Sequence, residues 1–396
     1  MTNIAIIGAG ITGVLSAYFL AKEGYKVTVF EQERYSAMRT SFANGGQLSV
    51  SNSEVWTTWS NVQKGIGWMF TKDAPLLIRP KPNLDKIVWL SKFLYHTAKS
   101  TSKENTIKSI ELGLQSRPLY EKIIKEENIK FDYSQCGILH IYKDQEYYNN
   151  ACAIKTLYND NGCDWEILEK TQTLSIDPAL MNITNIIGGA YTKTDSVGDI
   201  HKFCIELTTV LKNKYNVEFF YNSQIDKSMM AVLLQQYDKI VISAGVGSTK
   251  LAKIIGDSLS IYPVKGYSIT INVKSDQLKY MPQVSLLDDK AKIVTSTLGN
   301  RFRVAGTAEL DGENYDIRRD RIEPLLNWVS TNFPRLDIND YSSWACLRPM
   351  TPNMMPIIDK SNRNSKIYYH TGHGHLGWTY SPATAILLKD MIKNEG

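Results

Sequence analysis

The chain has 396 residues, of which 43% are hydrophobic and 21% charged, and its formal net charge at pH 7 is +5. This length can bury a large core and predicts two domains, and the ordinary composition indicates a globular protein rather than a low-complexity one. A charge this small for the length does not indicate nucleic acid as a partner, although it allows a mildly basic face towards an anionic surface.

The cysteines and the N-terminus bear on the compartment. The five cysteines contain no CxxC pair, which favours a reducing compartment, the cytoplasm, over a disulfide scaffold. Residues 1–21 are apolar but lack the basic region of a signal peptide and carry glycines at spacings that a signal does not need. No other stretch reaches the roughly 18 apolar residues of a spanning helix. We therefore expect a soluble or membrane-peripheral protein.

The first predicted unit is a strand, a glycine-rich turn and a helix. Residues 3–7 (NIAII) predict a strand, the sequence GAGITG occupies 8–13, and a helix is expected over 14–23. A second strand over 26–30 ends at Glu31. A GxGxxG between a strand and a helix, with an acid about twenty residues further on, predicts a dinucleotide site. An ordinary glycine-rich turn is the alternative.

Each part of this unit has a physical role in that site. Gly8 allows the tight turn, Gly10 lets the backbone approach a pyrophosphate, and Gly13 lets the helix pack closely on the strand. The helix N-terminus favours the phosphates, and Glu31 would accept hydrogen bonds from the ribose hydroxyls. The fingerprint does not separate FAD from NAD. Residues 41–49 (SFANGGQLS) are small and polar and suit a loop that runs along a cofactor.

The remaining elements follow in chain order. Extended runs with an alternating pattern predict an antiparallel sheet, and two further strands have the character of a parallel sheet. The expected elements are strands over 137–142, 216–221, 239–243, 262–273, 292–296 and 302–308, helices over 200–213 (capped by Asp199), 320–332 and 382–393, and a helical turn or two within 226–238.

The segment YHTGHGHLGWT, residues 369–379, holds three of the six histidines within six positions. A metal site would need further Cys, His or carboxylate ligands at workable spacing, and none adjoins the segment. We therefore expect no metal here, and the glycines to allow a close approach of the backbone to a cofactor.

Seven segments together resemble the D-amino acid dehydrogenases, within the wider family of FAD-dependent amine and amino acid oxidoreductases that includes D-amino acid oxidase and glycine oxidase. The segments are TSFANGGQLS, GWMFTKDAPLLIRP, DSVGDIHKF, VISAGVGS, YPVKGYSIT, WACLRPMTPNMMPIID and HTGHGHLGWT. They cover most of the chain, and SFANGGQ, KDAPLLIRP and LRPMTP are specific to the dehydrogenase branch. One departure is the expected helix within 226–238, where relatives have a small β-meander.

The resemblance implies an α/β fold with FAD as the cofactor. A Rossmann-like FAD-binding domain would comprise 1–54, 198–256 and 344–396, and a substrate domain built on an antiparallel sheet plus helices would comprise 55–197 and 257–343. The implied FAD contacts are Gly8, Gly10, Ile11, Thr12, Gly13, Glu31, Gln32, Ser41, Asn44, Gly46, Gln47, Leu48, Ile225, Ala244, Gly245, Gly372, His373, Gly374, Leu376, Gly377, Trp378 and Thr379. Relatives carry a histidine at the position of His373 but generally not at that of His375.

The implied reaction is oxidation of a D-amino acid by hydride transfer from the α-carbon to FAD N5. It gives an imino acid, which hydrolyses to a 2-oxo acid and ammonia, and the electrons pass to a quinone or another carrier. Such a reaction depends mainly on positioning. Arg348 matches the arginine that holds the substrate carboxylate in relatives, since its planar fork binds a carboxylate bidentately. A surface or interdomain ion pair is the alternative role for Arg348.

Three further residues have open roles. Tyr267 is expected on the pocket wall, with its hydroxyl available to the substrate, or as a plain strand tyrosine. Lys265 either approaches the flavin or ends a strand. Relatives have glycine in the place of Cys346, and sarcosine oxidases of the wider family attach the flavin to a cysteine that precedes a similar run. Cys346 is therefore a candidate for a thioether to the flavin, with a small apolar filler as the alternative.

The resemblance also implies possible peripheral contact with the inner face of a bacterial inner membrane. A helical stretch rich in aromatic residues could dip into the interface, or its aromatics could be core or pocket lining. The residues concerned are Trp56, Trp59, Trp68, Met69 and Phe70, interleaved with Lys64 and Lys72.

Three functional hypotheses follow. The first is a D-amino acid dehydrogenase, with a broad preference for small or apolar substrates. The second is an oxygen-dependent oxidase of glycine, sarcosine or another secondary amine. The third is an idle flavin-binding subunit, against which Arg348 argues because an idle site needs no carboxylate anchor. The preference for D over L substrates rests on the resemblance alone.

Overall fold

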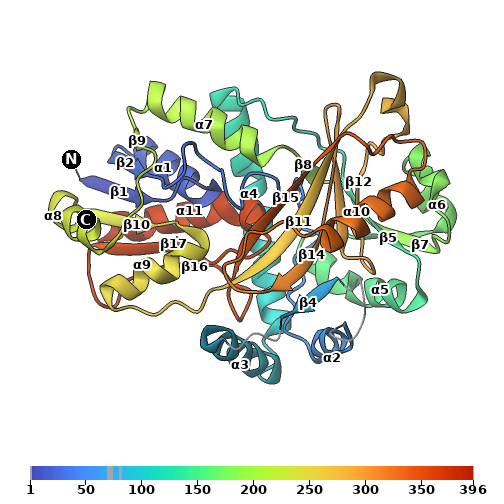
Figure 1. The fold of residues 1–396 in the computed structure, drawn as a ribbon, viewed down its shortest axis with the longest axis horizontal. Coiled ribbons are helices and arrows are strands. Elements are labelled where there is room, and N and C mark those ends of the chain that lie inside the picture. The colour runs from blue at the N-terminus through green and yellow to red at the C-terminus, as the bar shows by residue number, and fades with distance from the viewer. Residues whose placement is uncertain (1, 69–74, 80–82, 396) are drawn as a thin grey trace.

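The molecule has two halves, each built on a large β-sheet. The structure is a computed structural model that describes residues 2–68, 75–79 and 83–395. Figure 1 shows the N-terminal strands and the C-terminal helix α11 in one half, and the long strands β11, β14 and β15 at the centre. The mixed α/β fold class predicted from the sequence is confirmed.

The first sheet has six strands among the described residues, and all but β16 are parallel. In spatial order they are β16 (Ile357–Lys360), β17 (Ile367–Thr371), β10 (Lys239–Ile242), β1 (Asn3–Ile7), β2 (Lys26–Phe30) and β9 (Glu218–Phe220). Because the chain extends from β1 first to β2 on one side and later to β10 on the other, β1 marks the switch point of the sheet. A ligand crevice is expected outside the carboxyl ends of the strands there.

Alternating side chains of β1 face two helix layers. Ile4 and Ile6 pack against the helices of one face, whereas Ala5 and Ile7 pack against those of the other. The first layer is α1 (Ile11–Lys22), α7 (Ile200–Lys214) and α11 (Gly377–Asn394), and the second is α8 (Lys227–Gln236) and α9 (Ser248–Ile255). Both faces of this sheet are therefore buried, as parallel sheets require.

The second sheet is predominantly antiparallel and has nine strands in the described part of the chain. In spatial order these are β15 (Tyr341–Met350), β11 (Tyr262–Asn272), β14 (Arg301–Leu310), β13 (Ile293–Leu298), β12 (Ser285–Asp288), β5 (Ile138–Tyr142), β7 (Gly188–Thr192) and β6 (Glu166–Glu169), with β4 (Leu76–Ile78) beside β14. Two pairings are parallel, β12 with β5 and β14 with β4, which differs from the purely antiparallel expectation.

Further helices cover the second sheet and connect the two halves. Helix α10 (Arg319–Asn332) packs on the face that carries Tyr267, Ile269 and Phe302. The other elements are β3 (Gln47–Leu48), which pairs with β8 (Ser196–Val197), and the helices α2 (Trp59–Trp68), α3 (Leu84–Ala98), α4 (Ser102–Glu127), α5 (Gln145–Asp160) and α6 (Lys170–Ser175).

Predicted helices agree with the structure except at two starts. Asp199 caps α7 as expected, and α8 confirms the predicted helix within 226–238. Helix α1 begins at Ile11 rather than residue 14. Helix α11 begins at Gly377 rather than at Pro382, which lies inside it. Proline lacks the N–H that would bond the Trp378 carbonyl, and the hydroxyl of Tyr120 donates to that carbonyl instead.

The strand assignments bear on the predicted domain boundaries. Strand β15, which begins at Tyr341 and ends at Met350, belongs wholly to the second sheet, so the sheets divide after Met350 rather than at residue 344. Asp199 joins the halves because its carboxylate caps α7 and also pairs with Arg301 of β14, with 2.9 Å between Oδ2 and Nη2. The division into two domains remains a prediction.

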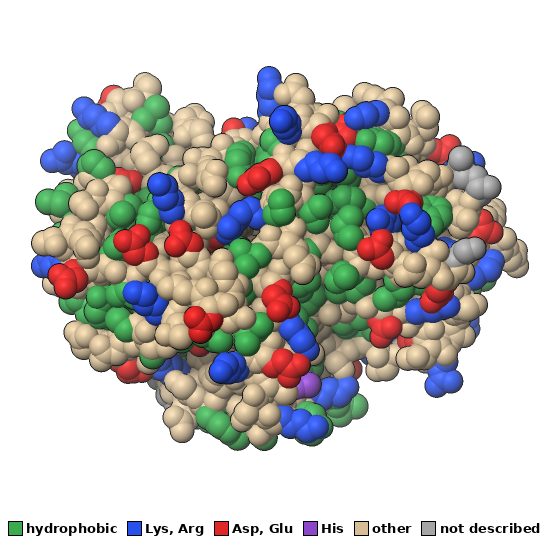
Figure 2. Space-filling view, turned by 180° about the vertical axis from the view of Figure 1, so that it is seen from behind, with side chains coloured by type: hydrophobic (Ala, Val, Ile, Leu, Met, Phe, Trp, Pro, Cys, Tyr) green, Lys and Arg blue, Asp and Glu red, His purple; other side chains and the backbone are tan. Residues whose placement is uncertain are grey.

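The surface offers no large region of one charge on the face that Figure 2 shows, where basic and acidic side chains alternate. None of the helices in the described ranges combines the length and the apolar character needed to cross a bilayer.

Candidate active site

In the glycine turn after β1, Gly8 and Gly13 lie close to backbone carbonyl groups, whereas Gly10 does not. A Cβ on Gly8 would lie 2.5 Å from the carbonyl oxygen of Ser243, and one on Gly13 would lie 1.8 Å from that of Gly8. The nearest atom to a Cβ on Gly10 is Ser41 Oγ at 3.5 Å, an ordinary contact, so a Cβ there would meet no protein atom too closely. Ser41 Oγ also accepts a hydrogen bond from the Ile11 N–H at 3.1 Å, which fixes the start of α1.

Glu31 stands at the carboxyl end of β2 beside this turn. Its Oε2 accepts from the Ala9 N–H at 2.6 Å and its Oε1 from the Glu33 N–H at 2.9 Å. Burial raises the pKa of the carboxyl group, and these backbone donors oppose the rise. The adjacent Gln32 is exposed and Thr12 half-buried. The geometry therefore brings the predicted ribose acceptor and the phosphate turn together.

The predicted cofactor loop, residues 41–49, is hydrogen-bonded to the second sheet. The Ala43 carbonyl accepts from Ser268 Oγ at 2.6 Å. The side chain of Gln47 donates to Ser285 Oγ at 2.8 Å, and that of Asn44 accepts from the Gly46 N–H at 3.0 Å. The side chains of Asn44 and Gln47 thus hold the loop, and Leu48 is buried.

The remaining predicted contacts lie at the same edge of the first sheet. Ala244 and Gly245 follow Ser243 at the end of β10, which pairs with β1, and the Gly245 carbonyl accepts from Thr371 Oγ1 at 3.2 Å. Ile225 is buried against the second helix layer, close to the end of β2. Three distant segments therefore meet beside the glycine turn.

The glycines of 372–377 allow the chain to pass close to β15. Gly372 and Gly374 have φ values of 73° and 59°, and a Cβ on Gly374 would lie 2.9 Å from Met350 Sδ. Gly377 begins α11, with Leu376 as its N-cap. The side chain of Trp378 packs into the core of the first half, and Thr379 Oγ1 accepts from the Ser49 N–H at 3.1 Å.

Two of the histidines in this segment are core residues. Nε2 of His370 and Nε2 of His373 each lie within hydrogen-bonding distance of Thr384 Oγ1, at 2.8 and 2.9 Å. Burial lowers the pKa of His370 to about 3 and that of His373 well below its usual value. No group of three potential metal ligands occurs among the described residues.

Arg348, the predicted carboxylate-binding residue, lies on β15 of the second sheet. On β15 it pairs with Val264, and its guanidinium lies over Gly266, where a Cβ would be 2.3 Å from Arg348 Nη2. Its Nη1 donates to the Thr307 carbonyl at 2.9 Å, and burial lowers its pKa. No carboxylate among the described residues forms an ion pair with Arg348. The ion-pair alternative therefore has no support in the described part of the chain.

Tyr267 does not reach Arg348. Successive residues of a strand point to opposite faces, and Gly266 and Arg348 share one face while Tyr267 occupies the other. The Tyr267 hydroxyl donates to Glu309 Oε2 at 2.6 Å beneath α10. The expected pocket-wall role is therefore corrected to a strand tyrosine in a buried polar cluster. Lys265 lies on that face too, with its Nζ 3.5 Å from Glu309 Oε2.

Cys346 is buried on the same face of β15 as Arg348, opposite Gly266. Burial raises the pKa of its thiol, which disfavours the thiolate, although the charge of Arg348 opposes the rise. The thioether to the flavin remains a prediction.

His375 had no predicted role, and the structure places it against Trp56. The two rings stack with their centroids 4.9 Å apart and an angle of 20° between their planes. The Trp56 side chain is therefore half-buried against His375. Trp59 is 55% exposed, whereas Lys64 bonds Glu146. The predicted interfacial residues Met69, Phe70 and Lys72 lie outside the described residues. The pairing of His375 with Trp56 carries no sequence signal because the two residues are far apart in the chain.

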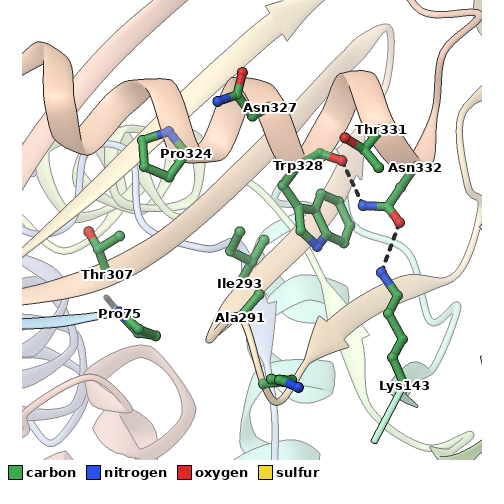
Figure 3. Close-up of a pocket in the computed structure, with 11 residues that line it drawn as sticks. Pro75, Lys143, Ala291, Ile293, Thr307, Pro324, Asn327, Trp328, Thr331 and Asn332 are labelled. Atoms are coloured by element: carbon green, nitrogen blue, oxygen red, sulfur yellow. Dashed lines mark hydrogen bonds between the residues drawn. The ribbon is translucent and has the colours of Figure 1, made fainter. Parts of the chain in front are cut away.

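A surface hollow of about 450 Å³ lies between α10 and the turn that joins β12 to β13 (Figure 3). Its lysines already have partners, since Lys143 Nζ donates to Asn332 Oδ1 at 2.9 Å and Lys290 Nζ to Asp144 Oδ2 at 3.1 Å. The hollow lies on the α10 side of the sheet, away from the glycine turn.

Comparison with known proteins agrees with this geometry. The sequence matches the family described as FAD dependent oxidoreductase (DAO) over residues 3–391. It is 44% identical to D-amino acid dehydrogenase 3 of Mesorhizobium japonicum, with 100% of this chain and 98% of that protein covered, and 34% identical to D-amino acid dehydrogenase of Dechloromonas aromatica, with 98% and 96% covered.

Solved structures share the fold at low sequence identity. Glycine oxidase from Geobacillus kaustophilus superposes with a TM-score of 0.75 at 17% identity over 100% of this chain and 95% of that one. L-Proline dehydrogenase from P. horikoshii gives 0.73 at 14% identity over 100% and 94%. The chain therefore belongs to the FAD-dependent oxidoreductase family, and it is an enzyme with FAD as its cofactor.

The described residues fit this cofactor. No protein atom crowds Gly10 at the N-terminus of α1, where a pyrophosphate is predicted, and Glu31, the predicted ribose acceptor, is hydrogen-bonded to Ala9 of the same turn. Ser243 Oγ, beside the turn, is buried without a protein partner among the described residues. The loop 41–49 and the start of α11 would hold the rest of the cofactor between the two sheets.

Proposed function

We propose that the protein oxidises D-amino acids to imino acids, which hydrolyse to 2-oxo acids and ammonia. The observation that carries the proposal is Arg348, a half-buried guanidinium that has no carboxylate partner in the described part of the chain. A cation that is partly removed from water and lacks a carboxylate partner is costly, so such an arginine is expected to serve an anionic ligand. The names of the relatives support a D-amino acid as that ligand.

The chain's own residues bind and orient the substrate. The Thr307 carbonyl holds Nη1 of Arg348, which leaves the outer edge of the fork for a bidentate contact with the α-carboxylate. Gly266 provides the room for the guanidinium, since any side chain there would displace it. FAD, when bound, supplies the acceptor for the hydride of the α-carbon, and positioning against it provides most of the rate.

The proposal includes an electron carrier and a membrane contact. We infer that the electrons pass to a quinone or another carrier at the cytoplasmic face of the inner membrane. Support for the contact comes from α3 rather than from the predicted segment 56–72. The exposed side of α3 carries the apolar side chains Leu84, Ile87, Val88, Leu94 and Tyr95, which are 43–75% exposed.

The substrate is tested by anaerobic mixing of the purified yellow protein with D-alanine, L-alanine, D-proline and sarcosine, followed by the visible absorption of the flavin. We expect the D-amino acids alone to bleach the flavin. Bleaching by sarcosine alone, with peroxide formed in air, would instead assign the oxidase reaction. No bleaching by any of the four would contradict the proposed substrate.

Two variants show whether Arg348 holds the carboxylate. Arg348→Met should lower the bimolecular rate of reduction by about 100-fold or more, since charge-assisted hydrogen bonds contribute about 1.5–3 kcal/mol each. Arg348→Lys keeps the charge but not the fork, and we expect it to recover only part of the rate. Equal rates in all three proteins, at equal flavin content, would contradict this role.

A further inference from the structure

His375 differs from the other two histidines of its segment in where its ring points. The rings of His370 and His373 are hydrogen-bonded to Thr384 under α11. The ring of His375 lies instead against Trp56, in the loop that follows β3. Its Nε2 atom is buried and has no hydrogen-bond partner in the described part of the chain. A buried polar atom without a partner is costly and indicates a missing ligand atom.

The backbone places this ring beside Arg348. The N–H of Gly374 donates to the carbonyl of Pro349 at 3.0 Å, so the residue before His375 is bonded to the residue after Arg348. Met350 and His373 form a further bridge between the two segments. The two side chains are close enough for the charge of Arg348 to act on the imidazole.

The imidazole is neutral and leaves Nε2 as an acceptor. Burial lowers the pKa of His375 to about 3, and the charges of Arg348 and Lys292 add to that effect. The backbone of Asn52 opposes the shift, as a carbonyl near a ring N–H does. A neutral imidazole has one N–H and one lone pair, and with the N–H on Nδ1 the lone pair lies on the partnerless Nε2.

We propose that Nε2 of His375 accepts a hydrogen bond from the amino group of the substrate whose carboxylate Arg348 binds. The proposal rests on the proposed function and adds a second substrate contact to it. Trp56 is a positioning residue, because its stacked ring fixes the plane of the imidazole. With the carboxylate and the amino group both held, the direction of the α-hydrogen is fixed for a given enantiomer, which is the alignment that hydride transfer needs.

The test compares two ligands that differ only in the amino group. D-Alanine carries it and propanoate lacks it. D-Alanine binding is measured from the concentration dependence of anaerobic flavin reduction, and propanoate binding from the change that it causes in the flavin spectrum. His375→Phe keeps a flat ring against Trp56 and removes the acceptor, whereas His375→Gln keeps an acceptor oxygen.

We expect His375→Phe to weaken D-alanine binding by about tenfold, the effect of one lost hydrogen bond, while the propanoate Kd stays within twofold. His375→Gln should recover part of the D-alanine affinity. Equal weakening of both ligands would assign His375 a purely structural role and overturn the proposal, and so would unchanged D-alanine binding. If His375→Phe does not retain flavin, D-alanine and propanoate binding are compared in His375→Gln and the wild type instead.

The wild-type protein separates failure of this proposal from failure of the proposed function. If sarcosine reduces the flavin and no D-amino acid does, the proposed function fails. The role of His375 is then decided with sarcosine and its amine-free analogue butanoate, for which the same selective weakening is expected. If no amine reduces the wild type, both proposals are overturned.

Discussion

His370 shows how burial makes a single side chain sensitive to pH. Its ring is hydrogen-bonded to Ser16 Oγ at 2.7 Å and to Thr384 Oγ1 at 2.8 Å, and burial lowers its pKa to about 3. In the unfolded chain the imidazole would titrate near its ordinary pKa of about 6.5. Between these two values the unfolded state therefore binds one more proton than the folded state, so the free energy of unfolding falls as the pH is lowered.

We therefore expect the FAD-saturated wild type to lose stability from pH 7.5 to 5.5, and His370→Gln to lose less. The slope should become shallower by at most about 1.4 kcal/mol per pH unit, the effect of one proton. Urea unfolding at the two pH values measures this difference. Thr384→Val is the matched control, because it removes a hydrogen-bond partner of His370 without removing a titrating group. An unchanged slope in His370→Gln would show that His370 is not neutral in the folded state.

The sequence names some candidate site residues and leaves others without a role for a geometric reason. Arg348 could be named as a candidate because the motif around it is local. Tyr267 was assigned to the pocket because the sequence does not show which face of a strand meets the cofactor, and the pairing of Gly266 with Cys346 puts Tyr267 on the opposite face. The contact of His375 with Trp56 depends on how two distant loops pack, which no local pattern encodes.

At the scale of elements, the strands β1 and β2 have the predicted bounds, although α1 begins earlier than expected, and the glycine turn between β1 and α1 is required by packing alone. A methyl group on Gly8 or Gly13 would lie within 3 Å of a backbone carbonyl oxygen, whereas Gly10 has an extended backbone, φ −72° and ψ −177°, that any residue can adopt. The start of α11 was missed because its proline is accommodated by a tertiary contact, the Tyr120 hydroxyl on the freed carbonyl of Trp378. The parallel pairing of β12 with β5 is likewise set by the fold as a whole.

Two alanine substitutions separate the packing role of these glycines from cofactor binding. Gly10→Ala should fold with nearly wild-type stability, within about 0.5 kcal/mol, because its methyl group meets no protein atom too closely. It should bind FAD much more weakly, because the methyl group would lie where the pyrophosphate is predicted to approach the backbone. Gly13→Ala should lose stability as well, by about 3 kcal/mol or more, because its methyl group would overlap the Gly8 carbonyl. Thermal unfolding of the flavin-free proteins and fluorescence titration with FAD measure the two effects. Wild-type FAD affinity in Gly10→Ala would show that the phosphates do not approach that residue.

At the scale of the whole molecule, the site depends on segments that cross between the sheets. The loop 41–49 leaves the first half and is bonded to β11, β12 and β13. Asp199 caps a helix of the first half and pairs with Arg301 of the second. Because the site forms only when the halves are packed together, sequence motifs alone could name its residues but not its shape.

The outer surface of α3 bears on the proposed membrane contact. The helix buries Trp89 and partly buries Phe93 on one side, and on the other exposes Leu84 (75%), Ile87 (58%) and Tyr95 (53%). The exposed apolar side of α3 is not covered by the described part of the protein. A bilayer interface can cover such a side. Exposed lysines on and after the helix, such as Lys92 and Lys99, suit an anionic surface.

We expect the wild type to float with anionic vesicles in a density gradient, and less so at high salt because screening weakens the attraction of the lysines. The double variant Ile87→Glu with Val88→Glu should lower the partition by about 100-fold, since burial of each aliphatic side chain contributes about 1.5–3 kcal/mol. Val232→Glu on α8, where the valine is 41% exposed, is the matched control and should float as the wild type does. A wild type that stays at the bottom of the gradient would exclude the contact. A double variant that still floats would show that the contact lies outside α3. Two carboxylates on that surface would be too costly to bury in the membrane interface.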